Sequence, residues 1–148
     1  MLYNSYMNEA PAPVQLSSLL HTAYAAQAEV EAKLGVVGLS LAKLLALKAL
    51  SEAGESMPLG QLAERLSCVK SNITQLVDRL EADGFVARQP DPADRRARLA
   101  ELTGKGRKAC TDGLRIQAEA EQALLGKLSR DEAHQLGALL EKLNASSG

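Results

Sequence analysis

The sequence predicts a mainly α-helical fold that carries one small β-hairpin. Of 148 residues, only 3% are aromatic and none is Trp, so the core would be built from aliphatic side chains. Those aliphatic residues recur at helical spacing along most of the chain. The pattern is interrupted once, at residues 85–102, where two strand-like segments flank a turn rich in proline and aspartate. The length favours one domain with one sizeable core.

The N-terminal part is expected to contain a tail and two helices. Residues 1–13 combine prolines and polar residues without a period, which is typical of a loose tail. Residues 14–34 have apolar side chains at helical spacing and stop before Gly35. Ser40 then lies where the N-cap of a helix over residues 41–53 is expected. The wide apolar stripe of that helix predicts that it is central and buried.

Two shorter helices follow. The first is expected at residues 59–66, with Pro58 in its first turn, where a missing N–H group is tolerated. The second is expected at about residues 70–83 and ends at Gly84, a residue type favoured just past a helix C-terminus. The predicted buried side of this second helix consists of Ile73, Leu76, Val77 and Leu80.

The hairpin is expected to consist of strands over residues 85–89 and 98–102, joined by a turn over residues 90–96. Leu99 and Leu102 are the predicted inward contacts of the second strand. Two short helices followed directly by a small β-hairpin is the order of elements in a winged helix-turn-helix.

The C-terminal part is expected to be helical again. A long helix over residues 103–128 has three glycines in its first part, which weaken it. Ser129 and Glu132 have the spacing of a capping box, and we expect them to open the last helix. The last helix has leucines on one face, at Leu136, Leu139, Leu140 and Leu143.

The charge is distributed unevenly along the chain. The formal net charge is only -1, which by itself does not indicate a nucleic-acid partner. From Arg65 to Lys108, however, there are 10 basic and 6 acidic residues, while the remaining residues include 7 basic and 12 acidic ones. A basic segment within an acidic remainder is the electrostatic pattern that a polyanion would attract.

Several other classes of protein lack their signals in this sequence. Cys68 and Cys110 do not have the spacing of a zinc site or a disulfide framework. No secretory leader or membrane span is evident, because the longest leucine-rich run, residues 39–50, is short and contains two lysines. Nucleophile motifs, phosphate-binding loops and paired catalytic carboxylates are also missing. We therefore expect a soluble, cytoplasmic protein that is not an enzyme and has no cofactor or metal.

The polar side of the helix over residues 70–83 has side chains suited to reading DNA. Short polar residues at the start of such a helix can reach base edges in the major groove, and Asn72 and Gln75 could each pair bidentately with an adenine. The alternative is that these residues only form the solvated face of an amphipathic helix. The polar side consists of Ser71, Asn72, Thr74, Gln75, Asp78 and Arg79.

The hairpin makes the DNA interpretation stronger. Arg95, Arg96 and Arg98 lie close together beside a turn-forming Asp-Pro-Ala-Asp sequence. Guanidinium groups on a rigid ribbon are suited to the negative potential of a narrow minor groove. A polar helix alone or a basic hairpin alone is often only solvated surface. The two together, in this spacing, indicate DNA binding more specifically.

The segments SNITQLVDRLEADGFV and DPADRRARLAELTGKGR resemble the MarR family of bacterial transcriptional regulators. The resemblance implies a winged helix-turn-helix lobe over about residues 55–103, within a single domain over residues 14–148. It also implies a homodimer held by helices over residues 14–34 and 104–145, with an effector pocket between that interface and each lobe. Asp94 would orient Arg96 by an ion pair. The DNA-binding residues implied are Lys70, Ser71, Asn72, Thr74, Gln75, Arg79, Asp94, Arg95, Arg96 and Arg98.

Two positions depart from the family pattern. Val69 stands where the family often has a capping side chain, so Ser71 or water would have to cap the recognition helix. Cys68 occupies a turn position that is usually aliphatic, and a buried cysteine usually behaves as a small hydrophobic residue. The alternative is a redox switch, in which oxidation of Cys68 would displace the recognition helix.

The functional prediction is a DNA-binding regulator, a repressor released from a pseudo-palindromic operator by a small effector or an oxidative signal. His21 and Tyr24 lie one helical turn apart and could line a pocket for a small aromatic or other effector, or else lie at the rim of a dimer interface. The competing hypothesis is a winged-helix module that binds another protein and not DNA.

Overall fold

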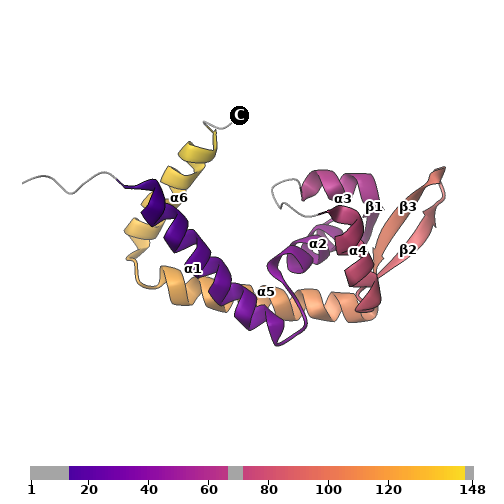
Figure 1. Cartoon of the computed structure of the whole chain (residues 1–148), viewed down its shortest axis with the longest axis horizontal. Coiled ribbons are helices and arrows are strands. Elements are labelled where there is room, and N and C mark those ends of the chain that lie inside the picture. Colours follow the sequence, from indigo (N-terminus) through magenta and orange to yellow (C-terminus); the bar gives the residue numbers. More distant parts are fainter. Residues whose placement is uncertain (1–13, 67–71, 146–148) are drawn as a thin grey trace, which may run out of the picture.

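The computed structural model describes residues 14–66 and 72–145. Figure 1 shows a lobe formed by α2, α3, α4 and the β-sheet, and a second part formed by α1 and α6. Helix α5 runs along both and joins them, which confirms the predicted order of helices and hairpin. The elements are α1 (Leu16–Gly35), α2 (Leu41–Glu52), β1 (Ser56–Pro58), α3 (Leu59–Arg65), α4 (Ile73–Ala82), β2 (Val86–Asp91), β3 (Asp94–Leu102), α5 (Gly104–Leu125) and α6 (Arg130–Ala145).

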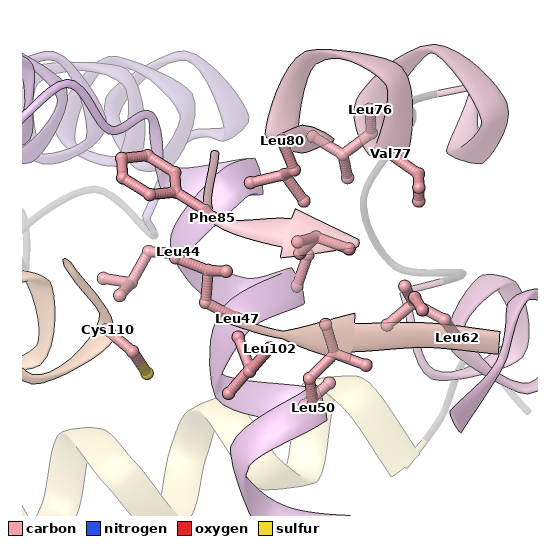
Figure 2. Close-up of a cluster of buried hydrophobic side chains, with 14 of the residues drawn as sticks. Leu44, Leu47, Leu50, Leu62, Leu76, Val77, Leu80, Phe85, Leu102 and Cys110 are labelled. Carbon is pink, nitrogen blue, oxygen red and sulfur yellow. The ribbon is translucent and has the colours of Figure 1, made fainter. Parts of the chain in front are cut away.

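The core of the lobe is built around α2. Leu44, Leu47 and Leu50 are fully buried, because α2 is covered by α3, α4, the sheet and α5 together. Figure 2 shows these leucines between Phe85 on one side and Leu62 on the other. The hydroxyl of Ser40 accepts a hydrogen bond from the N–H of Lys43 and caps the helix. Both predictions for this helix, that it is buried and that Ser40 caps it, are confirmed.

A three-stranded antiparallel sheet has the order β1-β3-β2, so its first strand extends the expected hairpin. The sequence analysis missed β1, because three residues are too few to show an alternating pattern. Met57 of β1 is buried opposite Ala100 of β3. Pro58 ends this strand and precedes α3, whereas we had expected it inside the first turn of that helix.

The hairpin is longer than the sequence predicted. Strand β2 continues through Pro90 to Asp91, which is possible because β2 lies at the edge of the sheet, where a missing N–H group is tolerated. The expected inward residues of β3 were partly wrong. Ala100 and Leu102 are buried, but Leu99 alternates to the opposite face and is only half-buried.

Glycine has a packing role at the start of α5. A Cβ atom at Gly106 would overlap the carbonyl oxygen of Phe85 and would lie 2.9 Å from its carbonyl carbon. The hydroxyl of Thr103 accepts a hydrogen bond from the N–H of Gly106 and donates one to the carbonyl of Gly84. The glycines of α5 were expected only to weaken the helix, but this one permits α5 to lie directly against the end of α4.

Helices α1 and α6 expose most of their large apolar side chains. No residue of α6 is buried in the single chain, and the predicted apolar stripe of α1 is largely exposed apart from Leu34. The capping box is confirmed, because Ser129 and Glu132 exchange hydrogen bonds between side chain and backbone. Within the described ranges, no helix is long and apolar enough to cross a membrane. The exposed side chains on these two helices include Leu16, Leu19, Leu20, Tyr24, Leu136, Leu139 and Leu140.

Candidate nucleic-acid interface

Helix α4 begins at Ile73, three residues later than the sequence predicted, and Asn72 is its N-cap. The Asn72 side-chain oxygen accepts hydrogen bonds from the N–H groups of Thr74 and Gln75, at 3.0 and 3.4 Å. The expectation that Ser71 or water would cap this helix was therefore wrong. The bidentate adenine contact proposed for Asn72 would compete with the cap, because both need the same oxygen.

The buried and polar sides of α4 follow the predicted pattern. Leu76, Val77 and Leu80 are buried, while Thr74, Gln75, Asp78 and Arg79 are exposed, and Ile73 is only half-buried. Among the described residues, the guanidinium of Arg79 and the side-chain amide of Gln75 have no hydrogen bond or ion pair. Both border a hollow of about 280 Å³ between α4 and the start of α2, lined also by Ser40 and Lys43.

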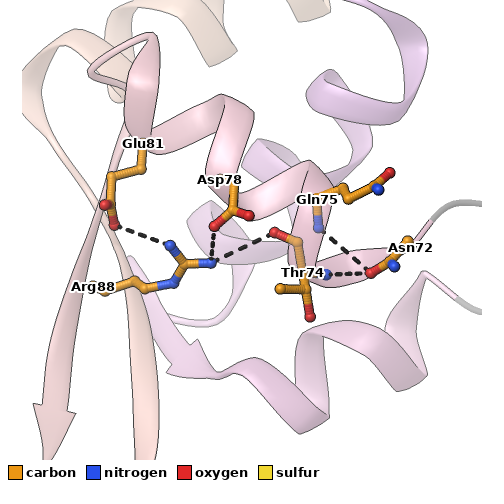
Figure 3. A network of polar contacts seen from close by, with 6 residues as sticks. All are labelled: Asn72, Thr74, Gln75, Asp78, Glu81 and Arg88. Carbon is orange, nitrogen blue, oxygen red and sulfur yellow. Dashed lines mark hydrogen bonds and ion pairs between the residues drawn. The ribbon is translucent and has the colours of Figure 1, made fainter.

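Arg88 of β2 forms a network that the sequence analysis missed (Figure 3). Its guanidinium lies 2.6 Å from a carboxylate oxygen of Asp78 and 3.5 Å from one of Glu81. It also donates to the carbonyl of Thr74 at 3.5 Å. Asp78 and Glu81 lie one turn apart on α4. Because carboxylates on a helix that faces DNA would repel phosphates, this pair in the sequence could have indicated that a basic side chain lies beside them.

The wing arginines are placed as expected, but Asp94 is not. Arg95, Arg96 and Arg98 are exposed on β3, and within residues 14–66 and 72–145 none of them forms an ion pair. The predicted ion pair between Asp94 and the Arg96 guanidinium is wrong: the Asp94 carboxylate instead accepts a hydrogen bond from the backbone N–H of Arg96, at 2.9 Å. Asp94 thus shapes the tip of the hairpin and leaves the guanidinium groups available.

The C-terminal end of α4 is fixed to two other helices, which the sequence also did not reveal. Lys43 of α2 lies 2.7 Å from a carboxylate oxygen of Asp83, and this pair is mostly shielded from solvent. Lys105 of α5 donates to the carbonyl of Asp83 at 2.8 Å and lies over the ring of Phe85. These contacts link the orientation of α4 to α2 and α5.

The predicted effector residues do not line the cavity that lies between α1 and the lobe. A cavity of about 260 Å³ lies among α1, α2 and α5, but neither His21 nor Tyr24 lines it, and both are exposed on α1. The cavity is lined by Ala26, Gln27, Glu29, Val30, Leu41, Gln117, Ala120, Glu121 and Leu124.

Four residues singled out from the sequence, Cys68, Val69, Lys70 and Ser71, lie outside the described residues. The other cysteine, Cys110, is buried in α5, and burial, with a further contribution from the Glu52 carboxylate, raises the pKa of its thiol. A protonated, buried thiol is a poor nucleophile. In the part of the chain that the structure covers, no three His, Cys, Asp or Glu residues are grouped as a metal site.

Comparison with known proteins agrees with this arrangement. Residues 39–97 match the model of the MarR family. The helix-turn-helix-type transcriptional regulator YkoM of Bacillus subtilis is 38% identical over 89 residues, which are 60% of this chain and 58% of the relative. The chain spans between about half and three fifths of the length of the first curated relatives that it matches.

Solved structures of similar fold extend the agreement to nearly the whole chain. A MarR family regulator from Streptomyces coelicolor has a TM-score of 0.76 and 29% identity, covering 90% of this chain and 92% of its own. A cysteine-to-serine variant of MarR from Escherichia coli, complexed with operator DNA, has a TM-score of 0.75 and 26% identity. The match covers 86% of this chain and 92% of the E. coli chain. Residues 39–97 therefore form a MarR family domain, and the fold of nearly the whole chain is that of MarR family transcriptional regulators.

Proposed function

We propose that this protein binds duplex DNA as a homodimer and represses transcription. The observation that carries the proposal is the set of exposed wing arginines, which form no ion pair with any described residue and lie on the same lobe as the polar side of α4. Side chains of α4 suit the major groove, and arginines on a ribbon suit the adjacent minor groove. The E. coli variant solved with operator DNA, similar over most of its length, supports the same use of the lobe.

Dimer formation explains the exposed leucines of α1 and α6. A second copy of the chain would cover them and would hold two copies of α4 at a fixed separation. Two recognition helices about one DNA turn apart, roughly 34 Å, read the two halves of a pseudo-palindromic site. Because bacterial DNA is in the cytoplasm, this function also places the protein there.

Effector release is the proposed mode of regulation, and the cavity among α1, α2 and α5 is the proposed effector site in place of His21 and Tyr24. An engineered cavity of about 150 Å³ holds benzene, so about 260 Å³ suffices for a substituted aromatic ring. Leu41 lines this cavity at the start of α2, and Lys43 on the same turn is paired with Asp83 at the end of α4. A ligand that moves α2 would therefore move the recognition helix.

Oxidation is the second candidate signal, and it concerns Cys68. The buried and protonated Cys110 is poorly suited to sense an oxidant. If Cys68 is the sensor, peroxide should abolish operator binding reversibly and Cys68→Ala should prevent that loss. An equal response to peroxide in both proteins would rule out this mode of regulation.

The proposal is tested by the salt dependence of binding to duplex DNA. For wild-type protein, the logarithm of the binding constant should fall with the logarithm of the salt concentration, with a slope of several units. Arg96→Ala should weaken binding about tenfold and reduce the slope by about one, without lowering the melting temperature. Arg115→Ala is the matched control, because Arg115 is exposed on α5 and paired with Glu119, outside the lobe surface.

A flat salt dependence together with unchanged binding by Arg96→Ala would favour the competing function, a winged-helix module that binds a protein partner. Selection of bound duplexes from a random pool completes the test. An inverted repeat among the selected sequences would establish DNA binding, two-fold symmetry and half-site spacing together.

A further inference from the structure

The hairpin contains two kinds of arginine, which differ in their surroundings. The side chain of Arg88 is only 25% exposed and is held by two carboxylates and a carbonyl of α4. Arg95, Arg96 and Arg98 are exposed and have no ion pair in the described part of the chain. Resting on the proposed DNA binding, we propose that Arg88 is a positioning residue that holds the wing against the recognition helix and does not itself contact DNA.

Both terminal nitrogens of the Arg88 guanidinium already face partners on α4. One terminal nitrogen of the guanidinium lies near Glu81, and the other donates to both Asp78 and Thr74. Figure 3 shows the guanidinium reaching along α4 from β2, while the Gln75 side chain points away from this network. A phosphate or base that bound one of these two nitrogens would compete with the partners on α4, and displacing a carboxylate would leave an unpaired negative charge beside the DNA.

The network also determines the charge of the surface that would face DNA. Asp78 and Glu81 carry two negative charges on the exposed side of α4, where they would repel phosphates. Arg88 is the only cation that forms an ion pair with either of them among the described residues. Its charge therefore reduces the net charge of this group of three side chains from −2 to −1, although it makes no contact with the nucleic acid.

The same contacts fix the distance between α4 and the hairpin. Within residues 72–102, Arg88 provides the only side-chain hydrogen bonds and ion pairs that join α4 to β2 or β3. Because α4 and the wing would enter different grooves of one duplex, their separation must match the groove spacing. Loss of Arg88 should thus reduce specific binding even though the free wing arginines remain.

The test is a set of paired substitutions, measured by DNA affinity and thermal unfolding. Arg88→Gln is made in wild-type protein and in a background carrying Asp78→Asn and Glu81→Gln. Arg98→Gln is the matched control, since it removes the same charge from an exposed arginine of the same hairpin that has no ion pair with the described residues. Each protein is titrated with a duplex selected from a random pool and with an unrelated duplex, and its melting temperature is recorded.

In wild-type protein, Arg88→Gln should weaken binding to the selected duplex about tenfold. In the background with Asp78→Asn and Glu81→Gln, the same substitution should weaken binding less than about twofold, because the carboxylate partners of Arg88 are already absent. Arg98→Gln should cause equal losses in both backgrounds. Equal losses for Arg88→Gln in both backgrounds would show that Arg88 contacts DNA directly, and no loss in wild-type protein would show that the network is dispensable. Either result overturns this inference alone, whereas failure of wild-type protein to bind any duplex overturns the proposed function.

Discussion

The lobe formed by α2 to β3 and the terminal helices α1 and α6 use leucine in opposite ways. In the lobe, leucines such as Leu47 and Leu62 are fully buried within one chain. On α6, the leucines are 38% to 59% exposed. Since both regions have leucine at helical spacing, the pattern alone does not distinguish a core from an interface. The comparison teaches that the lobe completes its own core, whereas the terminal helices leave an apolar surface exposed, which the proposed homodimer would cover.

The largest effect is expected from a substitution that breaks the lobe. Gly106→Ala should lower the free energy of unfolding by about 3 kcal/mol or more, because the new Cβ overlaps the rigid backbone carbonyl of Phe85. Gly60→Ala in α3 is the matched control, since no atom lies within 4 Å of its added Cβ, and it should be neutral or stabilising. Urea unfolding followed by circular dichroism measures both. Equal stability of the two variants would mean that α5 does not lie against the end of α4 as described.

A substitution on α6 should break the other region and spare the lobe. Leu139→Glu places a charge in the apolar surface of α6, and a desolvated unpaired charge costs several kcal/mol. The variant should therefore be monomeric in light scattering. Its affinity for the operator should fall about 100-fold. Ala145→Glu, at the end of the same helix, should leave the dimer intact. If Leu139→Glu remained a dimer with full affinity, another surface would hold the two copies together.

The cavity between the two regions offers a sharper test of how they are connected. Its polar lining includes Glu29, paired with Lys33, and the exposed Glu121, which has no ion pair among the described residues. Benzamidine and benzamide should therefore bind more tightly than the isosteric benzoate. Glu121→Gln should reduce the ratio of the benzamidine affinity to the benzoate affinity by about two- to fivefold. The affinity for benzamide should stay unchanged. Calorimetric titration measures this, and tightest binding of benzoate to wild-type protein would contradict the assignment.

A further modest effect concerns the cap of α4, where stability and DNA reading are separable. Asn72→Ala should lower the free energy of unfolding by about 1 kcal/mol, because two backbone N–H groups lose their acceptor. Asn72→Ser keeps a capping oxygen and should retain most of the stability. If Asn72→Ser binds the selected duplex as well as wild-type protein does, the role of Asn72 is capping. A large loss of affinity at unchanged stability would instead restore a base contact.

Local signals in the sequence were sufficient for most of the architecture. The caps at Ser40 and Ser129, the end of α4 at Gly84 and the buried stripe of α4 were predicted, because each depends on residues within one or two helical turns. The exposed arginines of the wing were also predicted, since a turn sequence fixed their place on a hairpin. The strand β1 was missed, because three residues become a strand only by pairing with β3.

The sequence by itself thus determined the fold class, the order of the helices and which faces are apolar. Only the tertiary structure decided which partners those faces and charges have. Arg88 and Asp78 are ten residues apart, Lys43 and Asp83 are forty apart, and Asp94 binds the backbone of Arg96 and not its guanidinium. The physical reason is range: helical periodicity and capping act within a few residues, whereas ion pairs and close packing depend on distances that the folded chain alone sets.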